Sequence, residues 1–377
     1  MTNRLAFVGV PCDIEALRKV EAFSLERNQK WAGSVTLQVG LFCRENWSYT
    51  CFRALIEDDY GVKLDDIEKF DIKKGNIIAH KKDGETLRFP LKKSRPYVRI
   101  GCQVCLDFAA ELSDISVGAV GSPPKWSTVV CRTKKGKAIF DGAVEGGYIE
   151  GKPIDEVKPG PNLIKKLTSD KRAENLEEAE KRKGEGVNVL HIKTLGLSEL
   201  NGEDNGENFE NLNRDIIDAG LCIACGACEA VCPEGCIKVT EQRPRFTGKC
   251  GDDCTDCYFF CPRTSLPQVA LENLNFDSDA RREVGIGRHL GIYAARATDE
   301  KTLSKGQDGG AVVAMLSYAL DKGIIDGVVS PRPGEDPWRP IPTLSKNSVD
   351  LKKTSGTIYS HSVTIPFLKH SSTGGMK

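Results

Sequence analysis

The sequence carries no net charge, has few aromatic residues and contains no long apolar run. Its 53 Lys and Arg residues balance 53 Asp and Glu residues, so no excess positive charge is available to attract nucleic acid or an anionic membrane surface. Aromatic residues make up 7% of the 377 residues and hydrophobic residues 40%, which is typical of a globular protein. No apolar stretch approaches the ~18 residues that a membrane span needs. We therefore expect neither a nucleic-acid partner nor a membrane span.

Histidine is also scarce, and no export signal is recognisable. The apolar stretch near the start ends at Pro11 and is too short for the core of a signal peptide. We therefore expect a cytoplasmic protein whose cysteines bind metal instead of forming disulfides. No Ser-His-Asp or Cys-His grouping for nucleophilic catalysis is visible. The five histidines show no metal-ligand spacing: His80, His191, His289, His361 and His370.

Cysteine, by contrast, is abundant and concentrated in one segment. Of fifteen cysteines, nine lie between Cys222 and Cys261. They form two runs, Cys222-x2-Cys225-x2-Cys228-x3-Cys232-Pro233 and Cys250-x3-Cys254-x2-Cys257-x3-Cys261-Pro262. The first is the run of bacterial two-cluster ferredoxins, in which the fourth cysteine ligates the other cluster. This crossing rule predicts one 4Fe-4S cluster on Cys222, Cys225, Cys228 and Cys261, and another on Cys250, Cys254, Cys257 and Cys232.

The alternative for this segment is zinc, because CxxC pairs also build zinc ribbons. Two four-cysteine runs that each end in Cys-Pro favour iron–sulfur clusters instead. The second run has one extra residue between Cys250 and Cys254, which makes Cys250 its least regular member. Cys236 lies outside both runs and is interpreted as a buried or spare thiol.

A second set of cysteines lies earlier in the chain. Cys12 and Cys43 follow or end predicted strands, and Cys102-x2-Cys105 is a further CxxC. In a parallel sheet the carboxyl ends of strands share one edge, where ligands usually bind. These four thiols are candidates for a third 4Fe-4S cluster, although single cysteines in α/β proteins are more often buried apolar residues. Two other cysteines are assigned to packing, namely Cys51 and Cys131.

The order of predicted elements indicates a mixed α/β protein. Strands at 5–10 and 35–43 alternate with helices that Asp13 and Ser48 are expected to cap, which favours a parallel layer. Residues 66–91 carry hairpin signals and predict an antiparallel meander. Further predicted elements are a strand at 126–132, a charged and mostly exposed helix at 162–183, an amphipathic helix at 310–322 and a strand at 325–330. Asp107 and Glu111 are expected to cap and solubilise a helix.

Six further segments carry a resemblance to a known family. They are VGVPCDIEALRK (8–19), GLFC (40–43), CQVCLDFAAELSDISVG (102–118), GSPPKWSTVVCRT (121–133), GQDGGAVVAMLSYALDKGIIDGVV (306–329) and SGTIYS (355–360). With the cysteine runs, they make the sequence similar to the beta subunit of coenzyme F420-reducing hydrogenase and its dehydrogenase, oxidase and sulfite reductase relatives. The resemblance implies FAD, at least one 4Fe-4S cluster, held by Cys12, Cys43, Cys102 and Cys105, and hydride exchange with the deazaflavin F420.

The resemblance also implies a flavin site at a glycine-rich turn. Closely spaced glycines before a helix let backbone N–H groups approach a phosphate or flavin edge. The alternative is a tight turn in which Asp308 caps the helix. The candidate flavin residues are Gly306, Gln307, Asp308, Gly309 and Gly310, with Ser355, Gly356 and Tyr359 as secondary candidates.

The order of the segments departs from the family. The VGVPC half comes first here, whereas in the family it follows the ferredoxin segment and the GQDGG half. A circular permutant, a reading frame cut from a tandem array, and halves completed by a neighbouring chain all account for this order. The expected domains are a carboxy-terminal-type half at 1–183, a linker at 184–213, a ferredoxin-type domain at 214–265 and an amino-terminal-type half at 270–377. The expected fold is a two-cluster ferredoxin-like domain inserted between two halves of an α/β flavin-binding domain.

The expected function is electron transfer between F420 and 4Fe-4S clusters through FAD, and onward to a partner. By resemblance, that partner is a subunit of hydrogenase, formate dehydrogenase or sulfite reductase type. The alternatives are a ferredoxin-type electron carrier without flavin, and a flavin reductase of the same family that uses another reductant.

Overall fold

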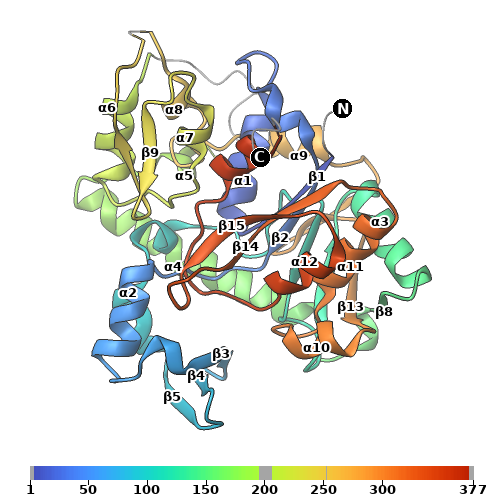
Figure 1. Ribbon diagram of the computed structural model, residues 1–377. Helices are drawn as coiled ribbons and strands as arrows, with labels where there is room; N and C mark the ends of the chain where they lie inside the picture. The colour runs from blue at the N-terminus through green and yellow to red at the C-terminus, as the bar shows by residue number, and fades with distance from the viewer. Residues whose placement is uncertain (1–3, 195–205, 252, 373–377) are drawn as a thin grey trace.

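The central element is one eight-stranded sheet (Figure 1). The computed structural model describes residues 4–194, 206–251 and 253–372. In spatial order the strands are β15 (Pro340–Ser345), β14 (Gly327–Pro333), β1 (Leu5–Gly9), β2 (Val35–Leu41), β6 (Ile115–Gly118), β7 (Ser127–Cys131), β13 (Gly291–Ala297) and β8 (Ile149–Pro153). Strands β14, β1, β2 and β6 run parallel, and the remaining strands pair antiparallel. The expected α/β layer is therefore confirmed.

Two segments far apart in the sequence build this sheet together. Strand β14 pairs in parallel with β1, with Val329 opposite Phe7. Strand β13 lies between β7 and β8, with Ile292 opposite Val130. The halves before residue 184 and after residue 270 thus assemble within one chain, which is consistent with a circular permutation of the two domains.

Helices cover both faces of the sheet, so its central strands are buried on each side. Along β1, Leu5 and Phe7 enter one apolar cluster, while Ala6 and Val8 enter the other, as the two-residue period of a strand requires. The helices of the first cluster are α1 (Pro11–Ala22), α7 (Ala227–Val231), α9 (Gln268–Asn275) and α13 (Ile365–Ser372). Those of the second are α3 (Lys134–Glu145), α11 (Ala311–Asp321) and α12 (Ser348–Leu351).

The predicted meander forms a separate three-stranded antiparallel sheet, drawn in blue at the lower left of Figure 1. Its strands are β3 (Ile67–Lys73), β4 (Asn76–Lys81) and β5 (Thr86–Pro90). Lys74 and Gly75 between β3 and β4 both have positive φ, 49° and 72°, as a tight hairpin turn requires. Just before this sheet, Ser48 caps α2 (Tyr49–Arg53), with its hydroxyl accepting the Cys51 N–H at 3.2 Å.

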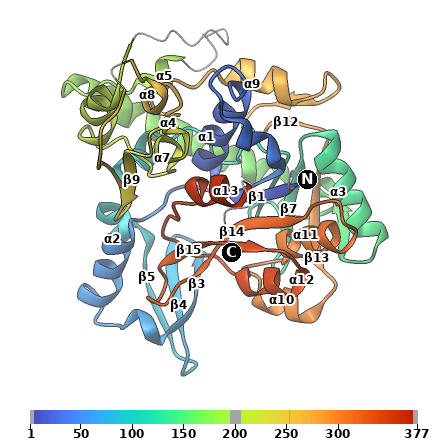
Figure 2. The same ribbon diagram turned by 45° about the horizontal axis from the view of Figure 1, so that its top comes forward.

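The cysteine-rich segment packs at one side of the sheet, as the yellow elements in Figures 1 and 2 show. Its elements are α6 (Phe209–Leu212), α7, β9 (Ile237–Thr240), β10 (Arg243–Phe246) and α8 (Asp256–Phe259). Of the predicted linker, residues 195–205 lie outside the described residues. On either side of them, Val189 and Leu212 are buried in an apolar cluster with several of the cysteines. A short helix, α5 (Leu190–Thr194), precedes the undescribed stretch.

The predicted helix at 162–183 is α4 (Pro161–Gly184), and most of its residues are at least partly exposed, as expected, but two of its cations are buried. Lys171 is 2% exposed and Arg182 is 7% exposed. The reason is that α4 packs against the 3-10 turn Ile100–Val104, so one face of the helix lies against the segment that carries the CxxC pair. Other short elements are α10 (Glu300–Lys305), β11 (Arg281–Glu283) and β12 (Gly287–His289).

Two expected helix caps are also corrected. Helix α1 begins at Pro11, two residues before Asp13, because proline suits the first helical position. Asp13 therefore lies in the first turn, where its carboxylate accepts the N–H of Val10 at 3.3 Å. Asp107 and Glu111 lie in a buried loop and not on a solvated helix, because Asp107 accepts the Glu111 backbone N–H at 2.9 Å inside the protein.

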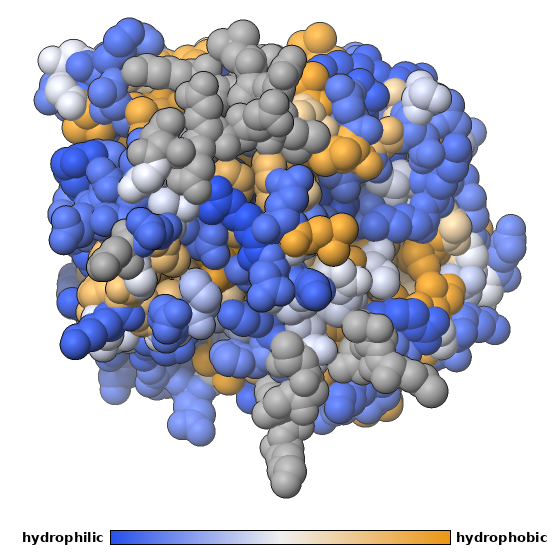
Figure 3. All heavy atoms as spheres, turned by 90° about the horizontal axis from the view of Figure 1, so that it is seen from above, coloured by the Kyte–Doolittle hydropathy of each residue, from blue (hydrophilic) through white to orange (hydrophobic). Residues whose placement is uncertain are grey.

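The face seen from above is mainly hydrophilic. Figure 3 shows apolar side chains there in small separate groups among hydrophilic ones. Within the described residues, none of the helices combines the length and apolar character that crossing a bilayer requires.

Candidate iron–sulfur centres

The four early cysteines line one cavity, which we call the proximal cavity. Cys12 lies in the first turn of α1, Cys43 follows β2, and Cys102 and Cys105 lie on or just after the turn Ile100–Val104. The strand end and the CxxC loop are tied together by a hydrogen bond from the Cys43 N–H to the carbonyl of Phe108 at 2.9 Å. The cavity is lined by Val10, Pro11, Cys12, Cys43, Arg44, Asn46, Arg99, Cys102, Cys105, Lys171, Ile223, Arg263 and His361.

Burial makes free thiolates costly in this cavity. Burial raises the pKa of Cys12, Cys43 and Cys102 above the usual thiol range, and the neighbouring cysteines add to the rise for each. Four thiols that repel one another as thiolates need a positively charged group between them. An iron–sulfur cluster supplies that charge, and four cysteines are its usual ligand set. The donor set of the proximal cavity therefore fits a 4Fe-4S cluster.

Two buried cations approach the same cysteine. The ammonium of Lys171 donates to the carbonyls of Cys43 at 2.8 Å and Asp107 at 2.6 Å, and to the sulfur of Cys105 at 3.6 Å. Arg263 also interacts with the Cys105 thiol. Burial lowers the pKa of Lys171, but the thiol charges of Cys105 and Cys43 outweigh this effect, so its pKa is raised and the side chain stays charged.

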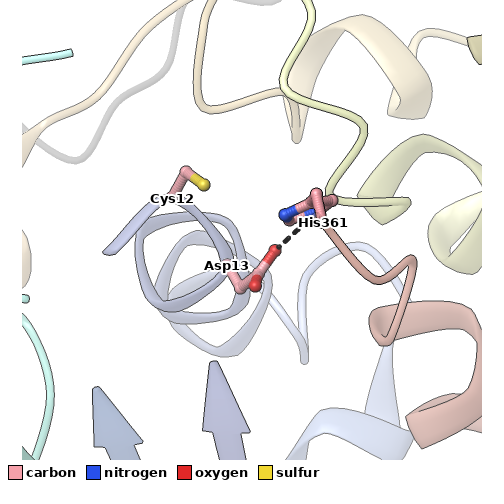
Figure 4. Close-up of side chains that lie close together, drawn as sticks. All are labelled: Cys12, Asp13 and His361. Atoms are coloured by element: carbon pink, nitrogen blue, oxygen red, sulfur yellow. Dashed lines mark ion pairs between the residues drawn. The ribbon is translucent and has the colours of Figure 1, made fainter. Parts of the chain in front are cut away.

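A buried polar pair lies beside Cys12 (Figure 4). The Nε2 atom of His361 lies 3.5 Å from a carboxylate oxygen of Asp13, and neither atom has a hydrogen bond within the described part of the chain. The two atoms are close enough for an ion pair, but burial lowers the pKa of His361 to about 3 and raises that of Asp13 to about 8. Both groups are thus neutral near pH 7, so we interpret the contact as one between uncharged groups.

A second cavity, the first ferredoxin cavity, gathers one of the two predicted ligand sets. It is lined by Cys222, Cys225, Cys228 and Cys261, together with Leu212, Ile216, Ile217, Ile223, Ala224, Gly226, Ala227, Pro244 and Arg263. Three of the thiols come from the start of the segment and Cys261 from its end, as the crossing rule predicts. Burial raises the pKa of these cysteines too. Two residues, Ile223 and Arg263, line both this cavity and the proximal one.

The other predicted ligands form a group with one additional member. Cys257 lies close enough to Cys232, Cys250 and Cys254 for their charges to raise its pKa further after burial has done so. The additional member is Cys236, whose sulfur lies 3.4 Å from that of Cys232. Cys236 is buried, as predicted, but the prediction did not place it next to Cys232. We call these five cysteines the second thiol group.

The candidate flavin residues come together at a different place. Gln307 donates to the carbonyl of Phe70 at 2.9 Å. Burial raises the pKa of Tyr359, and the charges of Asp71 and Asp308 add to the rise. Gly356 lies beside the carbonyl of Lys305, so the Ser355–Tyr359 loop borders the glycine turn.

The N–H groups of this turn are already partly engaged. Gly306 N–H donates to Thr302 at 3.0 Å, and Gly309 N–H donates to the Ser127 hydroxyl at 3.1 Å. These two groups are not free for a phosphate as the sequence argument expected. The cap of α11 is Gly310, with φ of 66°, and not Asp308. The hydroxyl of Ser355 has no hydrogen-bond partner among the described residues.

Lys171, Arg263 and His361 were missed as site residues by the sequence argument. Lys171 and Arg263 are single cations in charged or loop segments, and His361 is a lone histidine, so spacing gave no signal for them. The one available hint was the position of Arg263 directly after the Cys261-Pro262 pair.

Comparison with known families matches three parts of the chain. Residues 2–157 match the C terminus of the coenzyme F420 hydrogenase/dehydrogenase beta subunit, and residues 292–369 match the N-terminal model of the same protein. Residues 215–238 match a 4Fe-4S binding domain, which includes the first cysteine run.

Curated relatives and a solved structure are similar to about half of the chain. The coenzyme F420 hydrogenase subunit beta of Methanosarcina barkeri is 40% identical over 186 residues, which cover 49% of this chain and 64% of that protein. The coenzyme F420-dependent sulfite reductase of Methanocaldococcus jannaschii is 36% identical over 219 residues, which cover 55% of this chain and 33% of that protein. A structure of the F420-reducing [NiFe] hydrogenase complex from M. barkeri is 40% identical, covers 49% of this chain and 63% of its own, and superposes with a TM-score of 0.47.

This chain spans less than two thirds of the length of these relatives. Both domains of one family are nevertheless present, on either side of a 4Fe-4S binding domain. The chain therefore contains both domains of the coenzyme F420 hydrogenase/dehydrogenase beta subunit, the carboxy-terminal and the amino-terminal one, in reversed order.

Proposed function

We propose that this chain is an F420-linked iron–sulfur oxidoreductase module that passes electrons between coenzyme F420 and three 4Fe-4S clusters. The observation that supports it best is the adjacency of the proximal and first ferredoxin cavities, which share Ile223 and Arg263 as a common wall. Clusters held in these two cavities would be separated only by shared side chains, which supports electron exchange between them.

The proposed ligands follow the three groups of thiols. The proximal cluster takes Cys12, Cys43, Cys102 and Cys105. The ferredoxin-type domain, inserted between the two halves, takes Cys222, Cys225, Cys228 and Cys261 for one cluster and Cys232, Cys250, Cys254 and Cys257 for the other. Clusters held by these thiols would supply one-electron exchange between the proximal cavity, the first ferredoxin cavity and the second thiol group, in either direction.

FAD is the proposed link between F420 and the proximal cluster. A bound flavin supplies exchange between two-electron hydride chemistry and one-electron chemistry. The proposed holding residues are Gly306, Gln307, Asp308, Gly309 and Gly310, with Ser355, Gly356 and Tyr359. Because the N–H groups of Gly306 and Gly309 are engaged within the chain, we assign the polar contacts to the Ser355 hydroxyl and the Asp308 side chain.

The electron count of the proposed reaction balances. A hydride carries two electrons, so each hydride taken from reduced F420 would require two one-electron acceptors, and its hydrogen would leave as a proton. A cluster held by Cys232, Cys250, Cys254 and Cys257 would supply one-electron exchange with a partner enzyme subunit of hydrogenase, formate dehydrogenase or sulfite reductase type. In the opposite direction, two electrons from the partner and one proton form the hydride that reduces F420.

The proposal is tested by the content of anaerobically prepared protein and by its response to reductants. About twelve irons and one FAD per chain are expected, at four irons per cluster. Reduced F420 should bleach the flavin and cluster absorbance, whereas NADH and NADPH should not. Cys105→Ser should remove about four irons, while Cys51→Ser, a cysteine outside all three groups, should remove none. Zinc in place of iron, or colourless protein, contradicts the proposal.

A second candidate is an electron carrier of ferredoxin type without flavin. The engaged N–H groups of Gly306 and Gly309 favour it. It predicts eight or twelve irons, no yellow flavin after the clusters are removed, and no reaction with reduced F420.

A further inference from the structure

The two buried cations beside Cys105 differ in what they reach. Lys171 lines only the proximal cavity, whereas Arg263 lines the proximal and the first ferredoxin cavities. Both side chains are nearly fully buried, with 2% and 1% exposure. Their charges therefore act in surroundings where water screens them little.

Among the described residues neither cation forms an ion pair with a carboxylate, although the charge of Asp107 acts on Lys171 and that of Glu15 on both cations. The contacts of the Lys171 ammonium are two carbonyls and the Cys105 sulfur. The guanidinium of Arg263 donates to the imidazole of His191 at 2.7 Å and to the carbonyl of Gly101 at 3.4 Å. For both cations the strongest of these charge interactions is with Cys105, ahead of Asp107 for Lys171 and of Glu15 for Arg263, so both charges act on the ligand sulfur of the proximal cavity.

The charge of a cluster becomes one unit more negative on reduction. A fixed cation nearby stabilises the reduced form more than the oxidised form, and a hydrogen bond to a ligand sulfur acts in the same direction. A cation that reaches one cavity should therefore shift one reduction potential, and a cation in a shared wall should shift two.

We propose that Lys171 and Arg263 are positioning residues that set cluster potentials: Lys171 raises that of the proximal cluster alone, and Arg263 raises those of the proximal and first ferredoxin clusters together. This inference rests on the proposed function, because it requires clusters in both cavities. It adds a route by which the family domain and the cysteine segment are electrically linked through one side chain.

Lys171 also has a second role that its contacts define. Through the carbonyls of Cys43 and Asp107 it links the end of β2 to the CxxC loop. A neutral side chain at this position removes the charge and both links, so the test needs a variant that separates the two effects. Lys171→Arg keeps the charge and donors but changes the shape, whereas Lys171→Gln removes the charge.

The experiment is an anaerobic redox titration of the full chain, followed by electron paramagnetic resonance of the reduced clusters. Loss of one signal in Cys105→Ser identifies the proximal cluster, and loss of another in Cys228→Ser identifies the first ferredoxin cluster. In Lys171→Gln, the equilibrium constant for reduction of the proximal cluster should fall about tenfold, or about 59 mV for one electron, with the other two unchanged. In Arg263→Gln, the constants of both the proximal and the first ferredoxin clusters should fall.

Lys166→Gln is the matched control, because Lys166 lies on the same helix with its side chain 71% exposed. The cluster reduction potentials of this variant should equal those of the unchanged protein. The inference is overturned if all three clusters titrate and no reduction potential shifts in Lys171→Gln. It is also overturned if the potential of one cluster only shifts in Arg263→Gln. Either result leaves the proposed function intact. Absence of the proximal cluster from the unchanged protein overturns the proposed function itself. If Lys171→Gln fails to bind the proximal cluster, the Lys171→Arg variant is the deciding measurement. A proximal cluster bound by Lys171→Arg with an unchanged reduction potential supports the role of the charge. Loss of the proximal cluster from Lys171→Arg as well overturns the inference.

Discussion

A single methyl group added at Gly40 should separate the ligands of the proximal cavity. Gly40 lies in β2, three residues before Cys43, and faces the loop that follows Cys105. A Cβ atom at Gly40 would lie 2.3 Å from the Cβ of Ala110. Carbon atoms in contact are ordinarily about 3.5–4.0 Å apart, so the loop must retreat from the strand by more than about 1 Å.

This retreat acts directly on the cluster ligands. The hydrogen bond between Cys43 and Phe108, 2.9 Å long, joins the strand end to the same loop and would be lost or lengthened. Overpacking of a buried site typically costs about 1–3 kcal/mol. We therefore expect Gly40→Ala to lower the free energy of unfolding by that amount and to reduce iron by about four per chain, with the ferredoxin-type signals retained.

The matched control is Gly33→Ala, because a Cβ there meets nothing within 4 Å. Iron content, sulfide content and urea denaturation of anaerobically prepared proteins are the measurements. Gly33→Ala should bind iron like the unchanged protein. The reasoning is refuted if Gly40→Ala retains all of its iron and unfolds within about 0.5 kcal/mol of the unchanged protein, since that result means that the loop and strand do not meet as described.

Three further substitutions test other parts of the structure by denaturant unfolding. Arg132 is fully buried and donates four hydrogen bonds, to the Ser116 hydroxyl in β6, to the Ala109 carbonyl and to two carbonyls of the β11–β12 hairpin, so Arg132→Met should cost about 3–5 kcal/mol. Arg296, whose side chain is 38% exposed, is the comparison: Arg296→Met should cost less than about 1 kcal/mol, and equal effects would contradict the role of Arg132. Ser48→Ala removes a helix cap and should lower the free energy of unfolding by about 1 kcal/mol. An unchanged free energy of unfolding would contradict the capping role of Ser48. Gly309→Ala places a Cβ 2.5 Å from the Ser127 backbone nitrogen and should cost about 1–3 kcal/mol; a neutral result would mean that the turn is not packed as described.

Local spacing predicted more of this protein than long-range packing did. The hairpin at Lys74 and Gly75 and the cap at Ser48 depend on neighbouring residues, so the sequence was sufficient for both. The grouping of Cys222, Cys225, Cys228 and Cys261 also followed from spacing, because a known motif fixes which thiol crosses over. The confirmed parallel layer similarly depends on repeated strand–helix order.

The parts that sequence could not predict depend on which surfaces meet. The pattern of α4 is charged along its whole length, so nothing in it indicates that Lys171 faces the cysteines. His361 stands alone in the sequence and reaches Cys12 only because the last loop folds back over α1. The N–H groups of the glycine turn looked available, but Ser127, from a distant strand, occupies one of them.

The reversed order of the two domains is compatible with the site because the sheet depends on spatial pairing and not on chain order. The register that places Leu5 opposite Gly327 is made by backbone hydrogen bonds between strands that no short connection joins. The segment that separates them in sequence costs loop-closure entropy that grows only slowly with its length. Leu5 and Leu368 lie in the same apolar cluster, so the described ends of the chain are held on one face of the sheet without a covalent link between them. The proximal cavity takes residues from both domains and from the cysteine segment, so it can form only once these pairings have been made, whatever their order along the chain.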